Sequence, residues 1–358
     1  MISRRSLIAM PFAMAATVRA VEAQSPPPER AYWPTELWRR HRPDRHGVDA
    51  RLGQTVEQIM RDQMPDVTGF VVVRDGYIVA ERYQGAYGRD DPLKIRSVTK
   101  SFISALIGIA LDEGALTGLD QTIDELIPDR IPAGADPRTP GVTVRQLLTK
   151  TSGWAWDIGT DYPRLIASPN WVELTLSQPI VYEPGTFYAY NTGGSHVLSV
   201  ILAAATGEDT ADYAQEKLFG PLGIARPTWQ RSPQDEICGG FGLELTPRDM
   251  AKLGYLFLNE GQWDGEQIVP ADYVQAATVI QSSGDSTGLA LYGYQWWVTD
   301  TGGYPAYFAL GFGSQYVYVV PALDLVVVVA KGFESPPPPI TPSRPVIESV
   351  IIPAVTPR

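Results

Sequence analysis

The 358-residue chain has little of several residue types on which common catalytic designs depend. Its one cysteine, Cys238, excludes an internal disulfide and cysteine-rich zinc sites, and we expect it to be a small buried residue. The three histidines, His41, His46 and His196, show no zinc-ligand spacing, and His196 lies on a helical stretch where a structural hydrogen bond is expected. The sequence shows no glycine-rich phosphate loop before a helix. We therefore expect no metal and no cofactor.

Positive charge is also scarce, because the formal net charge is −11 and only 19% of the residues are charged. Nucleic acid and anionic membrane surfaces are therefore excluded as expected partners. With 44% hydrophobic residues, the chain is long enough to bury one large core or two coupled domains.

The N-terminus carries an apolar run that is too short for a stable bilayer anchor, and Arg4 and Arg5 precede it. This pattern predicts a twin-arginine export signal over residues 1–23, with cleavage before Gln24. An uncleaved N-terminal anchor is the alternative. Export predicts a periplasmic or secreted protein without stable membrane insertion after cleavage, and residues 24–52, rich in proline, arginine and tryptophan, are expected to be irregular.

Hydrophobic periodicity predicts strands near both ends of the chain and helices between them. Two strand-like runs, 69–74 and 77–83, flank Asp75-Gly76, a dipeptide typical of hairpin turns. The further predicted strands cover 294–298, 308–321 and 325–330. The predicted helices cover 97–112, 142–152, 196–206, 210–218, 247–260 and 344–354. The fold class is therefore α+β, an antiparallel β-sheet flanked by helices with an inserted, mostly helical subdomain. We expect one domain over 53–358, with the sheet from about 53–95 and 285–358 and the helical subdomain at about 110–245.

Ser97 and Lys100 stand three residues apart where an apolar helix is predicted to begin. Side chains at positions i and i+3 share one helix face, so the amine can reach the hydroxyl. The helix N-terminus also favours the negative charge that develops when a serine attacks an acyl carbon. The pattern predicts a nucleophile that needs no histidine, although Ser97 could instead cap the helix.

Five stretches, in this order, resemble the serine β-lactamase and penicillin-binding fold family, and most closely its class C branch with esterases and 6-aminohexanoate-dimer hydrolases. They are Ser97-Val-Thr-Lys-Ser-Phe, Val144-Arg-Gln-Leu-Leu-Thr-Lys-Thr-Ser-Gly153, Pro184-Gly-Thr-Phe-Tyr-Ala-Tyr-Asn-Thr-Gly193, Leu245-Thr-Pro-Arg-Asp-Met-Ala-Lys-Leu-Gly254 and Tyr292-Gly-Tyr-Gln-Trp-Trp297.

The resemblance implies that Ser97 is the acylated nucleophile and that Lys100 accepts or orients its proton. It also implies a Tyr-x-Asn tyrosine, which ungapped counting from Pro184 places at Tyr190, with Tyr188 as the competing position. The backbone N–H groups of Ser97 and Ser314 would form the oxyanion hole.

Two positions depart from the antibiotic-binding members of the family. Thr192 replaces the asparagine of Tyr-x-Asn, although Asn191 is adjacent, and Gly311-Phe312-Gly313 replaces a motif that begins with a cation. A substrate carboxylate would therefore lack its usual partner. The predicted pocket residues are Trp154, Tyr188, Asn191, Thr192, Gly311, Phe312 and Gly313.

These features predict an exported serine hydrolase that cleaves a small-molecule carboxylic ester or small amide through an acyl-enzyme. A β-lactamase or D-alanyl-D-alanine peptidase is one alternative. A non-catalytic ligand-binding protein of the same fold is the other.

Overall fold

The computed structural model describes residues 28–284, 290–332 and 340–357. The predicted export signal lies outside these residues. Within them, no helix combines the length and the apolar character needed to cross a bilayer.

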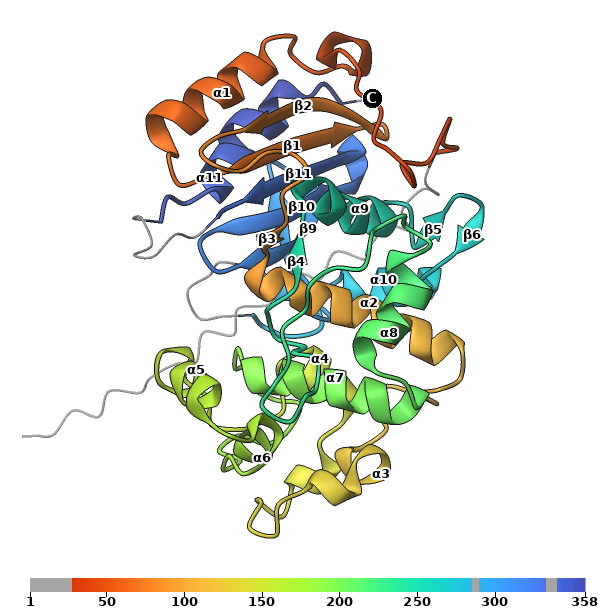
Figure 1. The fold of residues 1–358 in the computed structure, drawn as a ribbon, viewed down its shortest axis with the longest axis vertical. Coiled ribbons are helices and arrows are strands. Elements are labelled where there is room, and N and C mark those ends of the chain that lie inside the picture. The colour runs from red at the N-terminus through yellow and green to blue at the C-terminus, as the bar shows by residue number, and fades with distance from the viewer. Residues whose placement is uncertain (1–27, 285–289, 333–339, 358) are drawn as a thin grey trace, which may run out of the picture.

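A seven-stranded antiparallel sheet forms one half of the molecule, with strand order β2-β1-β11-β10-β9-β8-β7 (Figure 1). Its strands are β1 (Gly69–Arg74), β2 (Tyr77–Tyr83), β7 (Leu291–Tyr292), β8 (Trp297–Thr301), β9 (Tyr304–Gly311), β10 (Gln315–Val320) and β11 (Leu325–Ala330). Because β1 pairs with β11, the N-terminal hairpin and the C-terminal strands close into one sheet.

Both faces of this sheet are covered, which explains why its central strands are almost uniformly apolar. In β1, Phe70 and Val72 face α1 (Leu52–Gln63) and the C-terminal helical turns, while Val71 and Val73 face α9 (Pro247–Leu258). The C-terminal turns comprise α11 (Arg344–Val346), a π-helical turn (Ile347–Ile351) and a 3₁₀ turn (Ile352–Ala354).

The other half of the molecule is mostly helical and lies beyond α9, away from α1 (Figure 1). Its helices are α2 (Thr99–Asp112), α3 (Ile123–Leu126), α4 (Val144–Leu148), α5 (Ile158–Ala167), α6 (Trp171–Leu176), α7 (Thr192–Thr206), α8 (Thr210–Ala214) and α10 (Ala271–Ala277). Two small two-stranded sheets are formed by β3 (Leu93–Lys94) with β4 (Glu244–Leu245) and by β5 (Gln262–Trp263) with β6 (Glu266–Gln267).

The predicted α+β class with an antiparallel sheet is confirmed, and so is the hairpin around Asp75-Gly76, where both turn residues have positive φ. The helix predicted over 142–152 is wrong in length, because α4 ends at Leu148 and Lys150 has φ +62°. The strand predicted over 294–298 begins only at Trp297, because the chain bends at Gln295 with φ +61°.

Candidate active site

Ser97 lies in a 3₁₀ turn, Arg96–Val98, that leads directly into α2. Arg96 has φ +56°, so the chain enters this turn through a left-handed residue. One helical turn later, Lys100 donates from Nζ to the Oγ of Ser97 at 2.9 Å. The contact expected from the i and i+3 spacing is therefore formed.

Lys100 is buried and also donates to the backbone oxygen of Gly240 at 2.6 Å. It forms no ion pair with a carboxylate in the part of the chain that the structure describes. Burial without a compensating charge disfavours the ammonium form and lowers the pKa of Lys100 to about 7. An amine with this pKa is largely available as a base near neutral pH.

Tyr190 precedes α7 and is half-buried beside this pair. The Nζ of Lys100 lies 5.1 Å from the centroid of its ring. Burial raises the pKa of Tyr190 to about 12, and a hydrogen bond with Ser97 opposes that rise. Ser97 and Lys100, at the start of α2, and Tyr190, just before α7, therefore come together from segments that are far apart in sequence.

Tyr188 lies two residues earlier and packs into the core beneath the sheet. Its ring meets Tyr292 edge to face, with the centroids 5.3 Å apart, and it also contacts Trp297. Tyr190 contacts the same two rings, and its own ring also lies 5.1 Å from the Nζ of Lys100.

The first turn of α7 holds the two residues that follow Tyr190. Asn191 is the N-cap and its side chain accepts from the backbone N of Gly194 at 2.9 Å, so its carbonyl oxygen is used in capping. Thr192 packs against Gly240, where an added Cβ would lie 2.7 Å from the threonine Cγ2. This tight packing holds Gly240 at the position where its backbone oxygen accepts the hydrogen bond from Lys100.

The turn between β9 and β10 lies against the segment that carries the nucleophile. A Cβ added to Gly311 would lie 2.5 Å from the backbone oxygen of Ile95, so glycine is required there. Phe312 is 60% exposed, while Gly313 and Ser314 have positive φ. Both flanking strands contact the 96–98 turn, and the predicted oxyanion role of the Ser314 N–H depends on this proximity.

Arg96 is a basic residue at this position that the sequence analysis did not single out. Its Cβ would lie 3.4 Å from a Cβ on Gly311, and its charge opposes the burial-driven rise in the pKa of Tyr162 in α5. The Arg96 guanidinium therefore lies close enough to α5 for an electrostatic interaction with Tyr162. The only sequence signal was its place directly before the nucleophile.

The predicted pocket residue Trp154 is fully buried in the main core and donates from Nε1 to Thr139 Oγ1 at 3.2 Å. Cys238 is a buried free thiol, as expected, and precedes two glycines. At Gly239, a Cβ would lie 2.2 Å from the backbone oxygen of Ser195, so the chain packs directly on α7 there.

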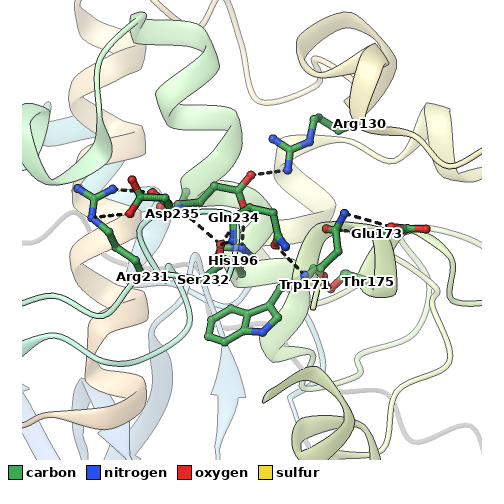
Figure 2. Close-up of polar contacts among 12 residues, drawn as sticks. Arg130, Trp171, Glu173, Thr175, His196, Arg231, Ser232, Gln234 and Asp235 are labelled. Carbon is green, nitrogen blue, oxygen red and sulfur yellow. Dashed lines mark hydrogen bonds and ion pairs between the residues drawn. The ribbon is translucent and has the colours of Figure 1, made fainter. Parts of the chain in front are cut away.

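His196 lies on α7, in a network that ties the 229–238 segment to the helical half (Figure 2). Its Nε2 lies 3.3 Å from Glu236, which also accepts from Ser232 and pairs with Arg130. Its ring meets Trp171 edge to face. These contacts fit the structural role expected for this histidine.

A second buried lysine, Lys150, lies in the stretch 144–153, and the sequence alone predicted no role for it. Its Nζ lies 5.7 Å from the ring centroid of Tyr190. The chain has only six lysines, and the presence of one of them in this stretch was the available signal.

Comparison with known proteins places the chain in a family. The family described as Beta-lactamase matches residues 52–341. The chain is 24% identical over 305 residues to the 6-aminohexanoate-dimer hydrolase of Paenarthrobacter ureafaciens, covering 78% of this chain and 76% of that protein. It is 28% identical over 204 residues to the esterase EstB of Burkholderia gladioli, covering 51% of each.

Among solved structures, the fold is similar to EstCE1, described as a hydrolase with promiscuous acyltransferase activity. The TM-score is 0.66 with 18% identity, over 79% of this chain and 93% of that one. The fold and the extent of the family match together show that this chain belongs to the Beta-lactamase family of serine hydrolases, which includes esterase and amidase relatives.

Proposed function

We propose that this protein hydrolyses a carboxylic ester or a small amide through an acyl-enzyme on Ser97, with Lys100 and Tyr190 as proton-transfer partners. The observation that carries the proposal is the 2.9 Å contact between Ser97 Oγ and a buried lysine whose pKa is lowered to about 7. A nucleophilic serine without a histidine needs a neighbouring base of this kind.

In the proposed acylation, the neutral amine of Lys100 takes the proton of Ser97 as Oγ bonds to the acyl carbon. The N–H groups of Ser97 and Ser314 stabilise the resulting oxyanion. The carbonyl then re-forms and the bond to the leaving group breaks. Tyr190 gives its proton to that group and regains one from Lys100. Water attacks the acyl-enzyme in the second half, and the proton returns to Ser97.

An ester or an uncharged amide is the proposed substrate because an exposed phenylalanine, Phe312, occupies the motif where a cation is usual in carboxylate-binding relatives. The names of the esterase and 6-aminohexanoate-dimer hydrolase relatives support the same bond types. One observation favours a second candidate, a β-lactamase or D-alanyl-D-alanine peptidase, since Arg96 starts beside Gly311 and could bind a carboxylate there.

A substrate comparison tests the proposal. The purified wild type and Ser97→Ala are assayed with p-nitrophenyl butyrate and with a chromogenic cephalosporin. We expect ester turnover that is lost in the variant, with much slower cephalosporin cleavage. Efficient cephalosporin cleavage that falls in Arg96→Gln would establish the second candidate instead. Binding of acyl ligands without turnover or an adduct would indicate a non-catalytic protein.

We also propose export to the periplasm or the medium, supported by Arg4, Arg5 and the apolar run that follows. Replacement of both arginines by lysine should retain the full-length precursor in the cytoplasm of a bacterial host. Unchanged export of that variant would contradict the proposal.

A further inference from the structure

Lys150 occupies an unusual place in the backbone, directly after α4. Its φ of +62° lies in the left-handed region, which costs a non-glycine residue free energy. The side chain is 2% exposed, so its amine is removed from water. A buried lysine in this backbone conformation destabilises the folded state unless its contacts compensate.

Those contacts hold the chain on both sides of Tyr190. The backbone oxygen of Lys150 accepts from the N–H of Ala189 at 2.8 Å. Its Nζ donates to the backbone oxygen of Asn191 at 2.9 Å. A single residue therefore fixes the residue before the tyrosine and the residue after it.

The amine of Lys150 is held in turn by a hydrogen-bonded chain. It donates to Ser195 Oγ, which donates to Gln295 Oε1 at 3.1 Å. The amide of Gln295 donates to the backbone oxygens of Leu147 and Leu148, at 3.0 and 3.1 Å. The chain thus returns to α4, the helix that precedes Lys150, and closes a rigid loop around the start of α7.

The titratable groups around Lys150 include no carboxylate partner in the described residues. Lys100 and Tyr190 face it from α2 and from the start of α7, and Tyr188, Tyr292 and Cys238 lie around those two groups. Burial and the charge of Lys100 lower the pKa of Lys150 well below its ordinary value.

We propose that Lys150 is a positioning residue for the reaction: it clamps Ala189 and Asn191 so that the hydroxyl of Tyr190 stays at Ser97. The inference rests on the proposed acyl-enzyme function and adds a residue to it. Lys150 does not touch the reacting atoms, and it acts only through the tyrosine. Small displacements of such a group cost much rate, because the reacting atoms must meet within a fraction of an ångström.

The first test compares Lys150→Met with Lys252→Met. Lys252 is a matched control, since it is also buried and also donates to two backbone oxygens, those of Thr35 and Gly223. We expect Lys150→Met to lower kcat for an alkyl ester, ethyl butyrate, about 10²-fold with little change in KM, because an alkoxide needs a proton donor to leave. Lys252→Met should lose stability to urea but keep its kcat. Equal kinetics of the two variants would overturn the proposal.

The second test asks whether Lys150 acts through Tyr190. The value of kcat for ethyl butyrate is measured in Lys150→Met, Tyr190→Phe and the double variant, and labelling of Ser97 by a fluorophosphonate is recorded beside it. The alkoxide of this ester needs a proton to leave, so its kcat reports on the tyrosine, whereas fluoride leaves the labelling probe without such help. We expect Lys150→Met to change kcat by less than about threefold once Tyr190 is phenylalanine, because the two effects are not additive.

A loss from Lys150→Met that persists in full in the Tyr190→Phe background would show that Lys150 acts by another route. Labelling of Ser97 in the wild type separates the two proposals. If the wild type labels normally while Lys150→Met behaves as Lys252→Met does, the positioning role fails and the acyl-enzyme function stands. If the wild type neither labels at Ser97 nor turns over ester, the function itself fails.

Discussion

Replacing Lys100 by methionine should stabilise the protein in a way that depends on pH. Methionine keeps the apolar stem but removes the amine and its two hydrogen bonds, to Ser97 and Gly240. The folded state lowers the pKa of Lys100 from 10.5 to about 7, so it binds fewer protons than the unfolded state between these values. Stability of the wild type therefore falls as pH decreases from 10.5 towards 7.

The magnitude follows from the pKa difference. The lowered pKa of Lys100 reduces the free energy of unfolding of the wild type by about 4 kcal/mol at pH 7 and by about 2 kcal/mol at pH 9. The lost hydrogen bonds cost the variant about 1 kcal/mol each, and this term changes little with pH. We therefore expect the stability of Lys100→Met, relative to the wild type, to rise by about 2 kcal/mol between pH 9 and pH 7.

Urea denaturation at pH 7, 8 and 9 measures this difference, and Ser97→Ala, which keeps the lysine, is the control. The control should follow the wild type in its pH dependence. Stability curves for Lys100→Met and wild type that stay parallel across this range would refute the argument, because they would show that folding does not change proton binding at Lys100.

Three further predictions concern the reaction and the turn beside it. The value of kcat/KM should rise with pH through a midpoint near 7 as Lys100 loses its proton. It should not fall before about pH 10, since the pKa of Tyr190 is raised to about 12. A pH–rate profile with a midpoint below 5 would contradict this. Tyr190→Phe should lower kcat for an alkyl ester by about 10² or more, whereas Tyr188→Phe should stay within about threefold in the same assay; the reverse order would move the catalytic role to Tyr188. Gly311→Ala should lower kcat/KM about tenfold and destabilise the protein by about 2 kcal/mol, because the new Cβ would lie 2.5 Å from the Ile95 oxygen. Gly118→Ala, whose Cβ would have nothing within 4 Å, should change stability by less than about 1 kcal/mol in thermal denaturation. Equal effects of the two substitutions would be inconsistent with the close approach.

Local signals predicted the parts of the fold that depend on neighbours in sequence. The turn at Asp75-Gly76 follows from residues that tolerate positive φ, and the approach of Lys100 to Ser97 follows from helical spacing. The end of α4 was not predictable in the same way. Its sequence has no proline or glycine before Gly153 to mark the end, and the left-handed turn at Lys150 is compensated by contacts with residues about forty positions later.

The site was predictable where a side chain acts on its own helix, and much less where two distant segments meet. The place of Tyr190 beside Lys100 came from the family resemblance, since no local rule brings the start of α7 to the start of α2. Lys150 and Arg96 were missed because each gains its position through a positive φ and a tertiary contact. Trp154 was proposed for the pocket by its position near a motif, but its ring fills the core beside Thr139.

The central claim is that Ser97 becomes acylated during turnover. Intact-mass spectrometry of the wild type, quenched in acid during the reaction with p-nitrophenyl butyrate, tests it directly, followed by peptide mapping of any adduct. We predict one butyryl group on the peptide that contains Ser97, and none on Ser97→Ala. Ester turnover without an adduct at Ser97, or an adduct that persists in the variant, would contradict the account.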